Sequence, residues 1–173
     1  MLQSAAIQDG GNKKSNSRFT RLLAYDISQP AEIRPALVAE YIVPLPQDSD
    51  GKTLAASEIA FVGKQQFLVL SRDSNGHGGD DTTSAFKFVL VFASSRNTSL
   101  TGFSPCRSID IVDISGATNI AGSSFDSHKN PVAPKGKLDK SVTAATYTTF
   151  LSLIDSTQLS RFGLHNGQGI PYT

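Results

Sequence analysis

The residues best suited to chemistry lie in one polar stretch, Ser71 to Thr83, SRDSNGHGGDDTT. It combines carboxylates, an imidazole and a glycine-rich backbone, and its candidate metal ligands are Asp73, His77, Asp80 and Asp81. Calcium accepts irregular cages of carboxylate and carbonyl oxygens, so an oxygen-rich Ca²⁺ site is one interpretation. A solvated hairpin tip is the other, because Gly, Asp, Asn and Ser also dominate turns. The residues alone leave both open.

A standard calcium-binding loop is excluded. Asp73, Asn75 and His77 alternate as in the first half of an EF-hand loop. However, Ser84 stands at the twelfth position, where a bidentate Glu is required, and no flanking helices are expected. Only the looser oxygen site remains from this pattern.

Arg72 and Glu58 form a second candidate site, for an anionic ligand. Arg72 follows an apolar run, and Glu58 lies on the partner strand of the same expected hairpin. A planar guanidinium pairs with a carboxylate and still presents donors to a phosphate or carboxylate. A structural ion pair that holds the hairpin together explains the same residues, and both interpretations stay open.

Arg161, His165 and Asn166, in SRFGLHNG, form a third candidate ligand-binding cluster, which is equally consistent with hydrogen-bonded structural residues. The sequence has no GxSxG elbow, no RHGxRxP, no HExxH and no phosphate-binding P-loop. No catalytic residue is therefore assigned. The enzymatic chemistry that remains is mainly metal-assisted hydrolysis.

Short β-strands must position these residues. Alternating or β-branched runs separated by Pro and Gly turns predict an all-β protein built as a sandwich, barrel or propeller. The expected strands span residues 19–28, 35–45, 57–62, 65–71, 107–115 and 146–154, the last with a helix as alternative. A helical turn is expected over 155–163, capped by Asp155 or Ser156. Residues 7–18 and 116–140 are predicted to be loops.

Composition excludes several classes of partner. The 173 residues carry a net charge of +1, which gives no electrostatic footprint for nucleic acid. No run approaches the ~20 apolar residues of a membrane span. The single cysteine, Cys106, cannot form an internal disulfide. The first twenty residues lack the apolar core of a signal peptide, so no targeting signal is expected in the chain as written.

Four segments in order, residues 56–87, 108–122, 130–147 and 158–167, resemble the phytase-like (esterase-like) domain of secreted fungal proteins. The order of RD, GHGGDD, DISGAT and RFGLHNG carries the resemblance. It implies a β-propeller, an extracellular location, and hydrolysis of phosphate or other esters. It covers about residues 2–167, whereas residues 168–173 form a tail unlike the family.

The resemblance also implies that residues 1–173 are part of a longer domain, truncated at both ends. A propeller has typically 4–8 blades. The expected strands account for about one to two, joined by long irregular loops. We therefore expect an incomplete propeller with open sheet edges and no activity of its own.

Residues 88–107 interrupt the resemblance between Lys87 and Ser108. The codons at the two ends of this segment can contain a GT, as at a splice donor site, and an AG, as at a splice acceptor site. We therefore predict that residues 88–107 come from a retained intron. Cys106 would then be no part of the mature protein. The alternative is a genuine strand, because FVLVF is strongly β-prone.

Two functions of the intact protein compete at this point. One is a metal-assisted hydrolase of a small-molecule phosphate or other ester, with Ca²⁺ as the one cofactor suggested. The other is a non-catalytic propeller that binds ligands or partners. The chain as written is also consistent with an inactive truncated gene product.

Overall fold

The computed structural model describes residues 1–9, 11, 16–28, 34–47, 51, 53–72, 106–153 and 155–163. Strands dominate these residues, so the all-β prediction is confirmed, and residues 146–152 form a strand and not a helix. Each described strand overlaps a predicted one. The elements are η1 (Ile7–Asp9), β1 (Phe19–Asp26), β2 (Ala36–Pro44), β3 (Ala55–Gly63), β4 (Gln66–Arg72), β5 (Cys106–Asp113), η2 (Pro134–Gly136), β6 (Thr146–Ser152) and α1 (Ser156–Ser160).

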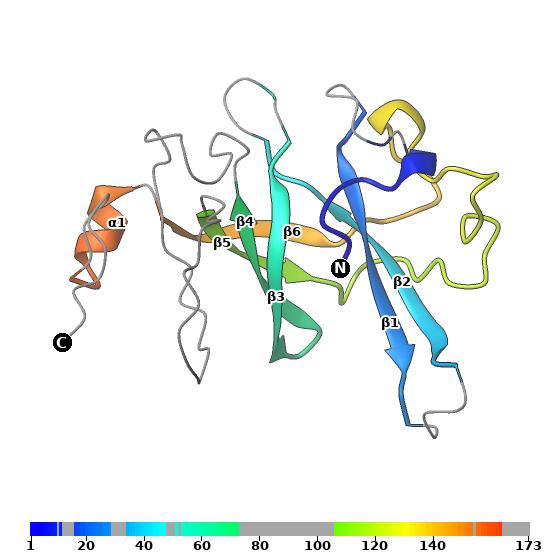
Figure 1. The fold of residues 1–173 in the computed structure, drawn as a ribbon, viewed down its shortest axis with the longest axis horizontal. Coiled ribbons are helices and arrows are strands. Elements are labelled where there is room, and N and C mark those ends of the chain that lie inside the picture. Colours follow the sequence, from blue (N-terminus) through cyan, green and yellow to red (C-terminus); the bar gives the residue numbers. More distant parts are fainter. Residues whose placement is uncertain are drawn as a thin grey trace, which may run out of the picture.

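The strands form two antiparallel sheets. β1 and β2 make a two-stranded ribbon, while β3, β4, β5 and β6 follow one another in a four-stranded meander. Figure 1 shows the long twisted β1–β2 hairpin beside the meander, with α1 at the opposite end of the molecule. Neither sheet closes on itself within the described residues. Glu58 and Arg72, the two candidate site residues within these strands, therefore lie on an open sheet.

Three consecutive residues at the β3–β4 turn have positive φ, beginning with Gly63, the last residue of β3, at 107°. Lys64 and Gln65 have φ of 49° and 64°, and they follow Gly63, which pairs with Gln66. Two consecutive left-handed residues match the twist of antiparallel strands, as in type I′ turns. The strands expected over 57–62 and 65–71 leave Gly63 and Lys64 for this turn, so the structure moves its centre by one residue.

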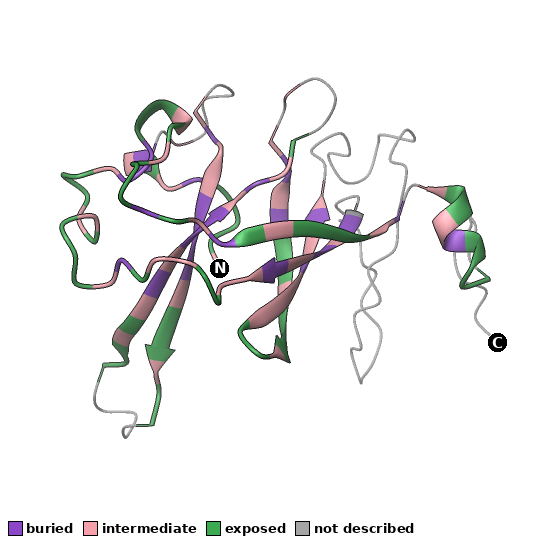
Figure 2. Ribbon diagram, turned by 180° about the vertical axis from the view of Figure 1, so that it is seen from behind, coloured by how far each residue is buried: buried purple, intermediate pink, exposed green. Residues whose placement is uncertain are grey.

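The β1–β2 ribbon is buried on both faces. Leu22 and Val43 face the four-stranded sheet and pack in a cluster with Ala56, Val69, Val112 and Ala145. Ile42 faces the other way and packs with Ile120, Val132, Ala133 and Val142 from the connection between β5 and β6. Figure 2 shows this burial concentrated where the ribbon passes the other elements. The connection, predicted as a loop, is thus an irregular layer with its own core.

Backbone hydrogen bonds fix that connection to the free edge of β2. The Glu40 carbonyl accepts from Ile120 N at 2.9 Å, and the Ile42 carbonyl accepts from Ala145 N at 2.8 Å. Asn119 Oδ1 accepts from Glu40 N at 2.9 Å. These bonds satisfy polar groups of a strand edge that would otherwise lack partners.

The first residues of the chain bridge the two sheets. Leu2 N donates to the Arg21 carbonyl of β1 at 2.8 Å, and Ala56 N of β3 donates to the Gln3 carbonyl at 3.0 Å. Figure 1 shows the N-terminus between β1 and β3. The ribbon and the meander are therefore connected by backbone bonds as well as by the shared core.

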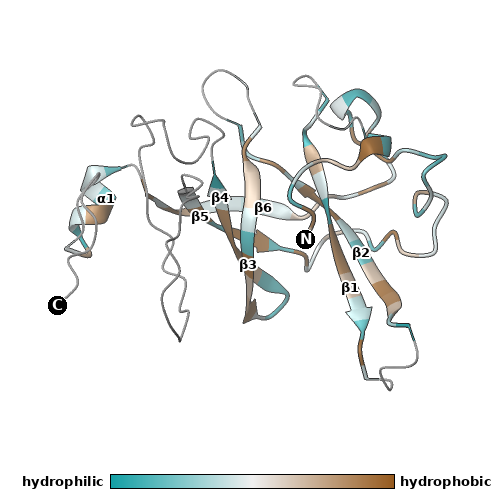
Figure 3. Ribbon diagram, viewed as in Figure 1, coloured by the Kyte–Doolittle hydropathy of each residue, from teal (hydrophilic) through white to brown (hydrophobic). Residues whose placement is uncertain are grey.

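The other face of the meander is only partly covered. Leu70, Ile109 and Leu151 pack against a small cluster of Leu153 and Leu159, the latter on α1. As predicted, Asp155 caps α1, accepting from Thr157 N at 2.8 Å and Gln158 N at 3.2 Å. Figure 3 shows hydrophobic residues, coloured brown, along the strands of the meander.

Candidate functional site

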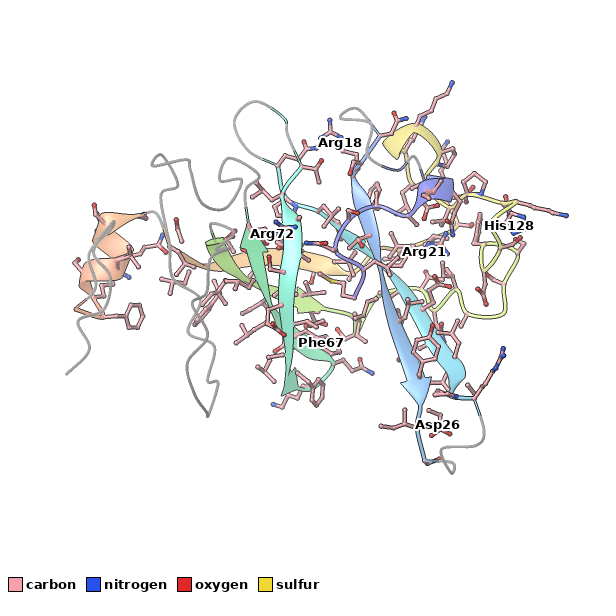
Figure 4. All side chains as sticks on the ribbon, viewed as in Figure 1. Arg18, Arg21, Asp26, Phe67, Arg72 and His128 are labelled. Carbon is pink, nitrogen blue, oxygen red and sulfur yellow. The ribbon has the colours of Figure 1, made fainter. Side chains whose placement is uncertain are left out.

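The structure places Glu58 and Arg72 on the same face of the β3–β4 hairpin. Glu58 lies opposite Leu70, two residues before Arg72 on β4, and side chains two apart on a strand share a face. Arg72 is the last residue of β4 and lies opposite Ala55. Glu58 is exposed and Arg72 half-buried. Figure 4 shows Arg72 beside β3, well apart from Arg21.

A shallow groove of about 290 Å³ runs along this end of β3. Its lining includes Met1, Gln3, Ser57 and Glu58. Arg72 reaches the groove through Gln3: its guanidinium Nε lies 3.2 Å from the amide oxygen when that oxygen is oriented toward the arginine. A carboxylate and a guanidinium therefore flank one groove.

The segment that carries the candidate metal ligands starts at this same place. Asp73 follows Arg72 directly in the sequence, but Asp73, His77, Asp80 and Asp81 lie outside the described residues. Among the residues that are described, no three His, Cys, Asp or Glu side chains gather as metal ligands would. The Ca²⁺ site stays a prediction.

Arg161 lies far from the Glu58 groove along the sheet. It is exposed at the end of α1, and its backbone N–H donates to the Gln158 and Leu159 carbonyls. α1 contacts β6, which is the opposite edge strand from β3. His165 and Asn166 lie outside the described residues, so the grouping of Arg161 with them remains a prediction.

A buried ion triad was missed by the sequence interpretation. Arg21 on β1 donates from Nε to Asp9 Oδ2 and from Nη1 to Glu40 Oε1, both at 2.8 Å. Nη1 also donates to the Phe125 carbonyl at 3.2 Å. Burial opposes ionisation, but the hydrogen bonds to Asp9 and Glu40 raise the pKa of Arg21 above its ordinary value. The guanidinium is permanently charged.

The same triad anchors the β5–β6 connection. Asp9 Oδ1 accepts from Val132 N at 2.9 Å and from Ala133 N at 3.4 Å. Arg21 Nη2 and Glu40 Oε2 are enclosed and have no partner among the described residues. A buried network of this kind specifies how η1, both ribbon strands and the connection fit together.

A second buried carboxylate, Asp110 on β5, collects three hydroxyl groups. Its Oδ2 accepts from Ser71 Oγ at 2.6 Å, Tyr147 OH at 2.7 Å and Ser108 Oγ at 2.9 Å. Burial raises the pKa of Tyr147 well above its ordinary value, and the adjacent Asp110 carboxylate adds to the effect. The phenol therefore stays protonated and acts as a donor. Asp110 is fully enclosed, so the cluster is structural and not a ligand site.

Sequence signals for these two clusters exist. Asp110 stands between Ile109 and Ile111, and Arg21 lies within a strand of otherwise apolar and small residues. A charge inside such a run is either outward-facing or buried with partners. The partner Asp9 gave no signal, because it lies in a polar segment that was predicted to be a loop.

Two further features concern membrane-spanning helices and surface depressions. Within the described ranges, no helix has the length and apolarity needed to cross a membrane. A second, larger depression of about 530 Å³ lies on the β5–β6 connection, outside the Glu58 groove.

One known family matches most of the chain. Residues 1–139 match the family described as Phytase-like: Esterase-like activity of phytase. A protein of Arthroderma benhamiae described as an uncharacterized secreted protein is 31% identical over 178 residues, covering 96% of this chain. The chain spans about 30% of the length of that relative. No solved structure matches. The chain therefore belongs to the phytase-like family, as the ordered sequence segments indicated.

Proposed function

We propose that this chain is part of a secreted phytase-like hydrolase, whose intact form cleaves phosphate or other small-molecule esters with the assistance of a metal. The observation that carries the proposal is the placement of Glu58 and Arg72 beside one groove at one end of the β3–β4 hairpin, where the Asp-rich segment follows in the sequence. Family membership supports the reaction class, and the description of the Arthroderma benhamiae relative as a secreted protein supports secretion.

The residues divide the chemistry between them. The Arg72 guanidinium supplies charge-assisted donors to the anionic oxygens of an ester. Glu58 presents an exposed carboxylate at the groove, where it orients a ligand hydroxyl or a water molecule. Asp73, Asp80 and Asp81 are hard oxygen donors, so their type fits Ca²⁺. When bound, such an ion neutralises negative charge on the substrate and lowers the pKa of a bound water.

The proposed architecture of the intact protein is a β-propeller. A four-stranded antiparallel meander such as β3–β6 is the unit from which propeller blades are built. The β1–β2 ribbon packs against it as strands of a neighbouring blade would. In this arrangement β3, an edge strand, would face the central channel, and the Glu58 groove would open into it.

The test uses the full-length protein, with hydrolysis of p-nitrophenyl phosphate and p-nitrophenyl acetate as readouts. Activity should fall on chelation and return with added Ca²⁺. Arg72→Ala should lower kcat/KM roughly 100-fold, since a charge-assisted bond to an anionic group is worth about 1.5–3 kcal/mol. Arg34→Ala, at an exposed arginine before β2, is the matched control and should leave kcat/KM unchanged.

Two results would reject the hydrolase. One is no turnover of either ester by a folded protein that still binds a ligand, which would identify the binding propeller instead. The other is turnover that chelation and Arg72→Ala leave untouched.

A further inference from the structure

We propose a second ligand site on the β5–β6 connection, a groove that binds a small organic anion through two lysines and an apolar wall. The groove has a volume of about 530 Å³, within the range of small-molecule sites. It is separate from the Glu58 groove, and the inference does not depend on the hydrolase proposed above. Figure 1 shows the connection on the far side of the ribbon from the meander.

The lining matches a ligand with two unlike ends. Its apolar part consists of Phe125, Pro131, Pro134 and Leu138. Its cationic part consists of Lys137 and Lys140, with Asn130 as a further polar group. An apolar body about the size of one ring would rest on the first part, while a phosphate or carboxylate head would accept hydrogen bonds from the second.

The one carboxylate in the lining is already engaged. Asp139 Oδ1 accepts from Ser141 N at 2.9 Å and from Ser141 Oγ at 2.6 Å. These hydrogen bonds lower the pKa of Asp139, so it stays ionised but is directed toward its own turn. Lys137 and Lys140 can therefore bind an anionic ligand, while the Asp139 carboxylate is hydrogen-bonded to Ser141.

The net charge around the groove also favours an anionic ligand. The connection from 114 to 145 carries Lys129, Lys135, Lys137 and Lys140 against Asp126 and Asp139. That gives a local net charge of +2, while the whole chain has +1. A positive excess on the segment that forms this groove favours an anionic occupant.

The buried triad holds the wall of this groove in place. Arg21 donates to the carbonyl of the lining residue Phe125. Asp9 accepts from the backbone of Val132 and Ala133, which lie between the lining residues Pro131 and Pro134. Val132 and Ala133 are fully buried. Because this wall is already fixed, ligand binding does not carry the entropic cost of ordering a loop, and the affinity is higher.

The experiment uses the full chain and phenyl phosphate as the probe, followed by isothermal titration calorimetry. Saturable one-to-one binding is expected. Lys137→Gln with Lys140→Gln should weaken it by roughly tenfold or more, because both charge-assisted contacts are lost. The matched control is Lys129→Gln, an exposed lysine of the same connection that is outside the lining, and it should stay within about twofold of the parent.

The proposal would be overturned by the absence of saturable binding, by equal weakening in Lys129→Gln, or by equal affinity for inorganic phosphate and phenyl phosphate. Equal binding of phenol would also overturn it, since no anionic head would then be needed. Circular dichroism of each variant verifies folding. Arg72→Ala should leave this binding unchanged, which separates the site from the proposed hydrolase.

Discussion

Arg21 on β1 and Glu40 on β2 form an ion pair of 2.8 Å in which the two residues are only 3% and 2% exposed. They do not lie directly opposite each other: Arg21 pairs with Ile42, and Glu40 with Leu23. The contact is therefore a diagonal across one face of the ribbon. Asp9 completes it from η1, so one guanidinium organises three segments of the chain.

The first prediction concerns this guanidinium. Arg21→Met should lower the free energy of unfolding by about 3–5 kcal/mol, because it leaves the carboxylates of Asp9 and Glu40 buried without their cation. Urea unfolding followed by circular dichroism measures the change. Arg34→Met, at an exposed arginine, should stay within about 0.5 kcal/mol of the parent. A loss below about 1 kcal/mol for Arg21→Met would contradict the role of the triad.

The second prediction is a pH dependence set by Tyr147. Its pKa is raised in the folded protein by burial, so above pH 10, its ordinary pKa, the unfolded chain releases this proton first. The stabilisation is thus complete below that pH and is lost above it, at about 1.4 kcal/mol per pH unit for one group. Urea unfolding between pH 8 and 11 measures the slope.

The matched variant for this prediction is Tyr147→Phe. It should be less stable at neutral pH by about 1 kcal/mol, because it removes one of three donors to Asp110. Its stability should also fall less steeply above pH 10 than that of the parent. Parallel slopes for the two proteins would show that Tyr147 ionises alike in both states.

Local sequence patterns predicted the strands well. Alternating and β-branched runs located all six described strands, and the Asp155 cap located α1, because such elements depend on neighbours in sequence. The turn centre shifted from Gly63-Lys64 to Lys64-Gln65 because Gly63 pairs with Gln66, so the two residues between them form the turn.

Contacts distant in sequence could not be predicted in the same way. Val132 and Ala133 lie in a Pro- and Lys-rich segment, yet they are fully buried because Asp9, more than a hundred residues earlier, accepts from their backbone. Of the candidate site, the placement of Glu58 and Arg72 on one face depends on the register shift between Phe61 and Gly63, which a regular hairpin pattern does not predict. The contact between Gln3 and Arg72 depends on backbone hydrogen bonds that connect the first residues of the chain to both sheets. No local sequence pattern predicts such bonds.

The third prediction tests the retained intron over 88–107. Deletion of these residues should leave the protein folded and slightly more stable, by about 0.7 kcal/mol, because the connection from Arg72 to Ser108 becomes less than half as long. The deletion removes the Arg72–Cys106 pair but keeps Ser71 opposite Ser108 and so the Asp110 cluster. Thermal unfolding measures the change. A Gly/Ser linker of equal length in place of 88–107 should match the parent. Clear destabilisation by both changes would favour a genuine strand there.

The fourth prediction concerns the exposed edge of β3. β3 ends the meander, and in the described part of the chain its Ala56 N bonds to Gln3 while Phe61 and Val62 remain 67% and 54% exposed. Apolar edge strands template pairing with further strands, so the isolated chain should self-associate as its concentration rises. Val62→Lys should shift sedimentation velocity toward the monomer, since a charged edge residue opposes pairing. Ile7→Lys is the matched control: Ile7 is 91% exposed but lies on η1, away from any strand edge, so its variant should associate like the parent. A parent chain that stays monomeric at every concentration would contradict the idea that this edge needs a neighbouring sheet.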